Sequence, residues 1–176
     1  MRQEPDTNGA VEPQFPASPG RRRELLALLA FAAACLAVAG VGGAVTALTV
    51  DDWYQTLNKP AFNPPDRLFG PVWTALYLMM ALAAWRVWRH RQNPGRRPAL
   101  LLFTIQLVLN LLWSCLFFGL MAVGAALVEI VVLWAAILVT TVRFGRIDRP
   151  AGWLMLPYAA WVSFAGVLNA AIWWLN

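Results

Sequence analysis

The sequence has little charge and few of the residues that carry common enzyme chemistry. Only 13% of its 176 residues are charged, with one histidine and two cysteines. A single histidine excludes a histidine-cluster metal site, and His90 has no acidic neighbour in sequence with which to begin a Ser-His-Asp triad. Cys35 and Cys115 both fall in apolar stretches, so neither a disulfide framework nor a redox motif is indicated. With no phosphate-binding glycine loop either, we predict no metal site and no required cofactor.

Long apolar runs dominate what is present, since 60% of the residues are hydrophobic. A helix of about 20 apolar residues spans a bilayer core, and a lipid-embedded backbone must satisfy its own hydrogen bonds. The run from 98 to 142 is too long for one crossing and must reverse at the small-residue segment 119–124. The sequence therefore predicts an all-α membrane protein, a five-transmembrane-helix bundle with helices near 25–48, 69–89, 98–119, 122–143 and 151–174.

The domain organisation follows from the same pattern. The first residues are rich in proline, glycine and polar side chains and lack periodicity, which predicts a disordered N-terminal tail over 1–24. The remaining residues, 25–176, form one transmembrane domain.

The charged residues separate by side of the membrane. Arginines gather in 21–23, 86–97 and 143–149, whereas the segment 51–67 carries three aspartates. The positive-inside rule then predicts the N-terminus inside and the C-terminus outside. Because topology and lipid contact account for the net charge of +5, we expect the lipid bilayer as a partner and no nucleic acid.

Aromatic and amide residues share helix faces. Of the ten tryptophans, those near helix ends match an interfacial belt, but others lie deeper. Such faces indicate either an aromatic pocket with amide contacts for a large planar hydrophobic ligand, or interhelical packing with hydrogen bonds. The stripes at helical spacing are Trp73 and Tyr77 on the second helix, Gln106, Asn110, Trp113 and Phe117 on the third, and Tyr158, Trp161, Ala165 and Asn169 on the fifth.

The connection between the first two helices adds to the pocket interpretation. Pro60, Pro64 and Pro65 make it stiff and extended, so it serves either as a lid over the aromatic layer or as a spacer. Trp53 lies in the same connection.

Two further features have open interpretations. Glu129 is a lone carboxylate inside a helix, and either a transport role or structural hydrogen bonding accounts for it. Ala39, Gly43 and Ala47 recur four residues apart on the first helix, a spacing that suits close helix approach in a dimer or within one chain.

Four segments carry a resemblance to a known family. They are 52–65 (DWYQTLNKP with NPP), 70–77 (GPVWTALY), 106–119 (QLVLNLLW with FFG) and 156–169 (LPY through Trp161 to LN). Together they resemble the TspO/MBR family, the tryptophan-rich sensory proteins also called translocator proteins or peripheral-type benzodiazepine receptors. The likeness extends over the chain from about residue 30 onward.

The resemblance implies a five-helix bundle, often a homodimer, in bacterial membranes or the mitochondrial outer membrane; a bacterial membrane is expected here. It implies binding of porphyrins and haem-related tetrapyrroles, of cholesterol in animal members, and of synthetic isoquinoline and benzodiazepine ligands. The matching positions that line the cavity are Trp73, Tyr77, Asn110, Trp113 and Trp161, beneath the proline connection.

Some positions depart from the family pattern. Phe62 replaces a tryptophan common in the connection, and Cys115 replaces a proline that commonly follows the third-helix tryptophan. Ala170 and Trp174 stand where animal members carry a tyrosine and an arginine of a proposed cholesterol motif, which argues against cholesterol as the main ligand.

Three classes of function are therefore expected. The first is a membrane receptor or regulator that binds porphyrin or haem-related tetrapyrroles, together with hydrophobic aromatic ligands, and sequesters or transports them. The second, implied by the resemblance, is light-dependent porphyrin degradation, with Trp73 and Trp161 as the catalytic residues. The third is a proton-coupled small-molecule transporter that would need Glu129; the lack of an inverted repeat counts against it.

Overall fold

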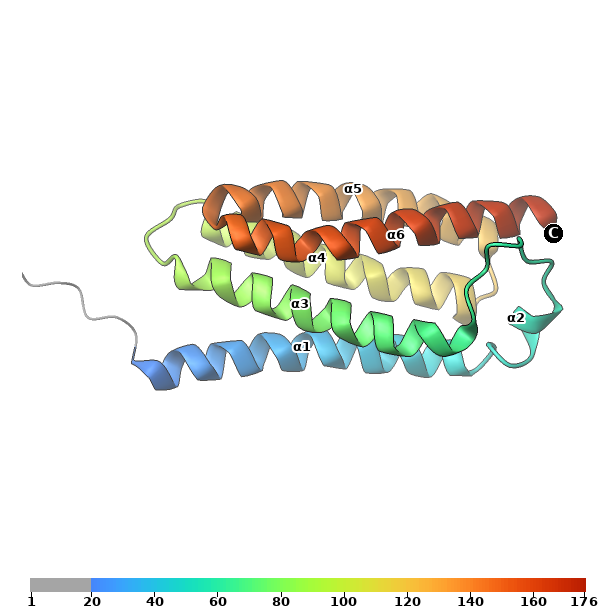
Figure 1. Ribbon diagram of the computed structural model, residues 1–176, viewed down its shortest axis with the longest axis horizontal. Coiled ribbons are helices and arrows are strands. Elements are labelled where there is room, and N and C mark those ends of the chain that lie inside the picture. Colours follow the sequence, from blue (N-terminus) through green and yellow to red (C-terminus); the bar gives the residue numbers. More distant parts are fainter. Residues whose placement is uncertain (1–19) are drawn as a thin grey trace, which may run out of the picture.

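The computed structural model describes residues 20–176, which form a bundle of long helices with two short helical segments in one connection (Figure 1). The predicted tail lies mostly outside this range. The elements are α1 (Arg21–Ala47), α2 (Trp53–Thr56), the 3₁₀ turn η1 (Asp66–Leu68), α3 (Phe69–Arg89), α4 (Arg96–Ser114), the π-helical turn η2 (Cys115–Gly119), α5 (Val123–Ile147) and α6 (Arg149–Leu175).

Five of these helical stretches are long and apolar enough to cross a membrane. The outward surface of the bundle is itself apolar, with side chains such as Leu101, Val128 and Val131 more than half exposed. A water-soluble surface would not carry so continuous an apolar cover. The predicted fold class, an all-α bundle of five transmembrane helices, is confirmed.

The first helix begins earlier than the sequence predicted. Residues 21–24 belong to α1 and not to the tail, and Glu24 already contacts α3. The carboxylate of Glu24 lies 3.4 Å from Arg89 Nε, and Trp85 Nε1 donates a hydrogen bond of 3.0 Å to the Glu24 carbonyl oxygen. These contacts extend the helix beyond its apolar stretch.

The long helices form a closed ring in the order α1, α3, α6, α5, α4, and α4 returns to α1. Figure 1 shows the connections from α3 to α4 and from α5 to α6 at one end, with the start of α1. The segment between α1 and α3, the turn between α4 and α5, and the C-terminus lie at the opposite end. The predicted arginine segments therefore share one end, which we call the arginine end, and the aspartate-bearing connection lies at the other.

The two halves of the bundle differ in packing. In the half near the arginine end, alanines such as Ala83, Ala84 and Ala99 are fully buried and let the helices approach closely. Phe103 and Phe144 stack there with ring centroids 5.8 Å apart. The half near the connection from α1 to α3 contains a cavity between the helices.

The reversal between α4 and α5 lies where the small residues predicted it. The Leu120 N–H donates to the Cys115 carbonyl oxygen at 2.8 Å, so the helix ends in a wider π-helical turn. Met121 follows with a φ of 54°, a left-handed conformation that allows the chain to reverse within a few residues.

The connection between α1 and α3 is less extended than its prolines predicted. It forms one helical turn at Trp53–Thr56 and a 3₁₀ turn at Asp66–Leu68, with extended backbone beginning at Leu57. The prolines are confined to the part between these turns, because proline disfavours helical backbone at the residue before it.

Candidate functional site

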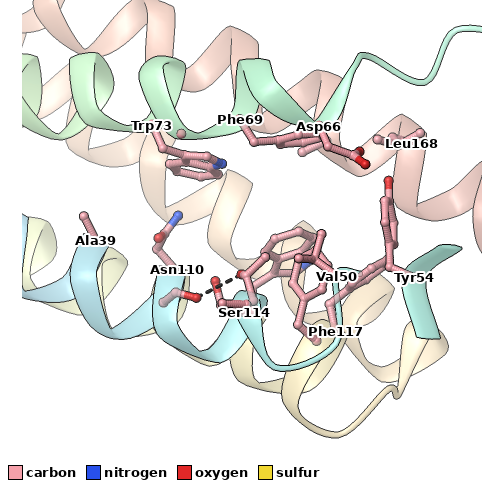
Figure 2. A pocket seen from close by; sticks show the side chains of 18 of the residues that line it. Ala39, Val50, Tyr54, Asp66, Phe69, Trp73, Asn110, Ser114, Phe117 and Leu168 are labelled. Atoms are coloured by element: carbon pink, nitrogen blue, oxygen red, sulfur yellow. Dashed lines mark hydrogen bonds between the residues drawn. The ribbon is translucent and has the colours of Figure 1, made fainter. Parts of the chain in front are cut away.

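A cavity of about 420 Å³ occupies the half of the bundle opposite the arginine end. Residues of α1, α3, α4, η2 and α6 line it, and among the described residues α5 contributes none. Figure 2 shows Trp73 and Phe69 of α3 facing Asn110, Ser114 and Phe117 across this space. Small-molecule sites commonly have volumes of about 300–1,000 Å³, so the cavity is large enough for such a ligand.

Tryptophan rings supply much of the apolar lining. Trp113 stacks on Phe117 with centroids 5.3 Å apart and an interplanar angle of 26°. Trp161 packs between Phe69 and Phe164, at centroid distances of 6.1 and 5.7 Å. These contacts hold the rings in place before any ligand enters, which reduces the entropy lost on binding.

One amide links three helices beneath the cavity. Asn110 Oδ1 on α4 accepts a hydrogen bond from the Tyr77 hydroxyl on α3. Its Nδ2 donates to the Tyr158 hydroxyl on α6 at 3.1 Å. Asn110 is buried and also lines the cavity, so the network fixes the orientation of its side chain in the cavity wall.

The side-chain amide of Asn169 on α6 is also held by two hydrogen bonds. Asn169 Oδ1 accepts a hydrogen bond of 3.1 Å from Trp113 Nε1, and its Nδ2 donates to the Val123 carbonyl oxygen at 3.0 Å. The indole N–H of Trp161, by contrast, is buried without a hydrogen-bond partner within residues 20–176.

The structure brings most of the predicted ligand-binding residues to this one cavity. Those that line it are Trp73, Tyr77, Asn110, Trp113, Phe117, Trp161, Ala165 and Asn169.

The other four predicted residues do not line the cavity, so we correct their placement. Tyr158 is fully buried behind the wall, where it contacts Asn110 and the Trp73 ring. Gln106 is also fully buried, one helical turn before Asn110 on α4. Neither polar atom of its side chain has a partner in the described chain. Trp53 packs edge-on against Phe117 at 5.8 Å and supports the wall from outside.

Pro60 is the fourth of these residues. The prolines of the connection do not reach the cavity; its ends do, through Asp51, Tyr54 and Asp66. Tyr54 belongs to α2 and Asp66 to η1, so a helical turn at each end of the connection brings a side chain to the cavity.

Burial and charge both act on Tyr54. They raise its pKa to about 12, with burial as the larger cause and the Asp66 carboxylate as the second. The hydroxyl therefore keeps its proton near neutral pH and donates to Asn63 Oδ1 at 3.0 Å. Lys59 Nζ lies 4.1 Å from the centroid of the Tyr54 ring, so the connection is held by both polar and cation–π contacts.

Sequence reasoning missed several lining residues. Phe69 and Phe164 fall at helical spacing from Trp73 and Trp161, so extending the aromatic stripes would have found them. Residues of α1 carried no comparable signal, because this helix is apolar on all sides. Those that line the cavity are Ala39, Gly42, Gly43, Thr46 and Ala47.

The stripe of small residues on α1 therefore lines the cavity of a single chain. Ala39, Gly43 and Ala47, predicted as a site of close helix approach, all face the cavity. Nearby, Gly42 lies against Ser114 of α4: an added Cβ would lie 3.3 Å from Ser114 Oγ. The homodimer remains a prediction.

Glu129 lies on α5, outside the cavity lining. Neither carboxylate oxygen has a hydrogen-bond partner in the range 20–176, and the two interpretations of Glu129, transport and structural hydrogen bonding, stay predictions. Over the same range, no three His, Cys, Asp or Glu side chains gather as metal ligands.

Known proteins are similar to this chain in sequence. The sequence pattern of the TspO/MBR family matches residues 31–175. The chain belongs to the TspO/MBR family. The segments that carry the aromatic and amide lining residues all fall within the matched range.

Individual TspO/MBR relatives match between 69% and 88% of this chain. It is 44% identical to the tryptophan-rich protein TspO of Chlorobaculum tepidum over 88% of this chain and 98% of that protein. It is 41% identical to the tryptophan-rich sensory protein of Cereibacter sphaeroides, over 80% of this chain and 85% of that protein. The human translocator protein is 37% identical over 69% of this chain and 73% of its own length.

Proposed function

We propose that this TspO/MBR protein binds a porphyrin or haem-related tetrapyrrole in the cavity and sequesters or transports it. The observation that carries the proposal is one cavity lined by the rings of Trp73, Trp113 and Trp161 with oriented amides beside them. Flat aromatic walls suit a large planar ligand because ring stacking adds to apolar burial.

Titration with protoporphyrin in the dark tests this proposal. We expect tryptophan quenching of the purified, detergent-solubilised protein to saturate in the micromolar range or below. Trp73→Ala should weaken binding about tenfold or more, since it removes a central aromatic wall. Asn110→Ala should weaken binding as well, because it removes an oriented amide and leaves two tyrosine hydroxyls without their partner.

The matched control is Trp174→Ala, because Trp174 is 83% exposed and does not line the cavity. It should leave the affinity unchanged. If Trp73→Ala and Asn110→Ala bind protoporphyrin as tightly as the native chain does, the cavity is not the binding site. Unsaturable quenching in the native chain would overturn the choice of ligand.

A second candidate function is light-dependent degradation of the bound porphyrin. The observation that favours it is a cluster of oxidisable rings at the cavity wall, with Trp73 5.7 Å from Tyr77 and 6.2 Å from Tyr158 between centroids. In this reaction the excited pigment and dissolved oxygen would supply the oxidation, and Trp73 and Trp161 would stabilise the electron or radical.

Illumination of the complex separates the two candidates. Degradation would be supported if the pigment loses absorbance only when the protein is present. Trp161→Phe should then abolish this loss while weakening binding in the dark only modestly. Saturable binding with no protein-dependent bleaching would support the receptor alone. Trp174→Phe controls for general photochemistry of exposed indoles.

We further propose that the arginine end faces the cytoplasm, with the N-terminus inside and the C-terminus outside a bacterial membrane. Support comes from the gathering of arginines at one end of the bundle and of aspartates at the other. In this orientation the cavity lies in the outer half of the membrane.

A further inference from the structure

A second hollow lies at the arginine end, on the outside of the bundle where α5 passes into α6. It has a volume of about 320 Å³. None of its residues lines the ligand cavity. The side chains of Trp153 and Leu156 on its wall are 69% and 52% exposed, so it opens toward the surrounding lipid. Its lining residues are Thr141, Gly145, Arg149, Gly152, Trp153 and Leu156.

Two glycines create this hollow. The backbones of α5 and α6 touch at Gly145 and Gly152: a Cβ added at Gly152 would lie 2.7 Å from Gly145 Cα. Small residues at a crossing allow such contact. A Cβ added at Gly145 would meet only Gly152 Cα, at 3.8 Å, so the space beside Gly145 stays open. The result is a furrow bordered by Thr141 and Leu156.

The positively charged side chain of Arg149 lines one end of the furrow. Arg149 is exposed and, within the described range, has no carboxylate within ion-pair distance. The adjacent Asp148 is already engaged, since Arg86 contacts both its oxygens at 3.0 and 3.1 Å and His90 Nε2 lies 3.1 Å away. Its charge is therefore balanced by α3, and that of Arg149 is not.

We propose that this furrow binds one anionic phospholipid from the leaflet at the arginine end. The Arg149 guanidinium contacts the headgroup phosphate, since basic pockets between transmembrane helices bind anionic headgroups. The Trp153 ring lies at the level of the glycerol backbone, the depth that tryptophan favours in a bilayer. One acyl chain lies in the furrow over Gly145 and beside Leu156.

Charge favours a lipid over a second copy of the chain. In a two-fold symmetric pair built on this seam, the same patch of each copy would meet, which brings Arg149 against its counterpart. Arg143 and Arg146 are exposed at the same end and would add to the repulsion. An anionic lipid instead neutralises this charge.

Native mass spectrometry of the full chain released from detergent tests the proposal. The probes are phosphatidylglycerol and phosphatidylcholine with identical acyl chains, added at matched concentrations. We expect one phosphatidylglycerol to be retained at least about fivefold more tightly than phosphatidylcholine, and Arg149→Gln to remove this preference. Thr141→Phe, which fills the furrow without changing charge, should weaken retention of both lipids.

Arg146→Gln is the matched control, because it removes the same charge at the same end but lies outside the furrow. It should retain the preference for phosphatidylglycerol. Equal retention of the two lipids by the native chain would overturn the proposal, as would equal loss of the preference in Arg146→Gln and Arg149→Gln. Helix content and the thermal midpoint of each variant, measured alongside, show that lost retention does not come from unfolding.

Discussion

At the scale of single residues, Asn110 shows how one polar side chain organises an apolar interior. Its oxygen and nitrogen bind hydroxyls from two other helices, so α3, α4 and α6 meet at one amide. Unsatisfied polar groups are costly in lipid, and this pairing makes only one relative rotation of the three helices favourable. The same amide then borders the cavity, which ties the position of a binding group to the packing of the fold.

Gly152 offers a test of packing at this scale. We predict that Gly152→Ala lowers the free energy of unfolding by about 1–3 kcal/mol, because the new Cβ would lie 2.7 Å from Gly145 Cα and 3.0 Å from its backbone nitrogen. Backbone atoms cannot move aside as a flexible side chain could. The measurement is denaturant-induced unfolding in detergent micelles.

The control is Gly40→Ala, at a position where an added Cβ meets nothing within 4 Å. It should cause no loss of stability, since alanine is the better helix former. Equal destabilisation by the two substitutions would contradict the glycine contact.

At the scale of elements, Asp148 joins α3 to the start of α6. Its carboxylate caps α6 by accepting the Ala151 N–H at 2.9 Å and also binds Arg86 and His90 of the α3 end. Partial burial raises the pKa of Asp148, but the hydrogen bonds from Arg86, His90 and Ala151 outweigh it and lower the pKa to about 2. The sequence contains no hint of this contact, because the partners lie 62 and 58 residues away.

We predict that Asp148→Asn lowers the free energy of unfolding at neutral pH by about 1–3 kcal/mol, since it removes charge-assisted hydrogen bonds. The folded pKa of Asp148 lies below its ordinary value of 3.8, so its contribution is present above that pH and is lost as the pH falls toward 2. Thermal unfolding of both chains as a function of pH measures this. The difference in stability between the native chain and Asp148→Asn should shrink as the pH falls from 3.8 toward 2. A difference that stays constant over this range would contradict the prediction.

A second link between elements holds the connection from α1 to α3 against the end of α6. Asn176 Oδ1 accepts the Asn58 N–H at 2.9 Å, and its Nδ2 donates to the Asn58 carbonyl oxygen at 3.1 Å. The same connection contributes Tyr54 to the cavity wall. Loosening this link should therefore ease the escape of a bound ligand.

We predict that Asn176→Ala increases the dissociation rate of bound protoporphyrin about threefold or more, since two exposed hydrogen bonds are lost. Stopped-flow fluorescence on displacement measures the rate. Asn176→Asp keeps the acceptor and loses the donor, so its rate should fall between the two. Identical rates in all three chains would show that this link does not control release.

At the scale of the whole molecule, charge separates the two ends of the bundle. We predict that in intact cells a membrane-impermeant maleimide labels Asp52→Cys and not Gln92→Cys, each made in a Cys115→Ser chain. Both positions are exposed, the first between α1 and α3 and the second between α3 and α4 at the arginine end. The reverse labelling pattern would contradict the proposed orientation; labelling of both in lysed cells is the control.

The number of helices and their approximate limits could be predicted from the sequence because crossing a membrane is a local property. About 20 consecutive apolar residues suffice, whatever the neighbours are. Stripes on three helices also predicted Trp73, Asn110 and Trp161 in the cavity, since polar and aromatic residues at helical spacing mark a face. On α1 no such contrast exists, so its part in the cavity could not be predicted.

The sequence by itself determined that this protein is a five-helix membrane bundle with arginines at one end, through hydropathy and charge along the chain. Only the tertiary structure decided the order of the helices around the ring and the pairing of Asp148 with Arg86. It also decided that Tyr158 lies behind the cavity wall while Trp161, one turn away, lines it. The physical reason is that these features depend on the relative rotation and contact of helices distant in sequence, which side-chain packing sets and local hydropathy does not.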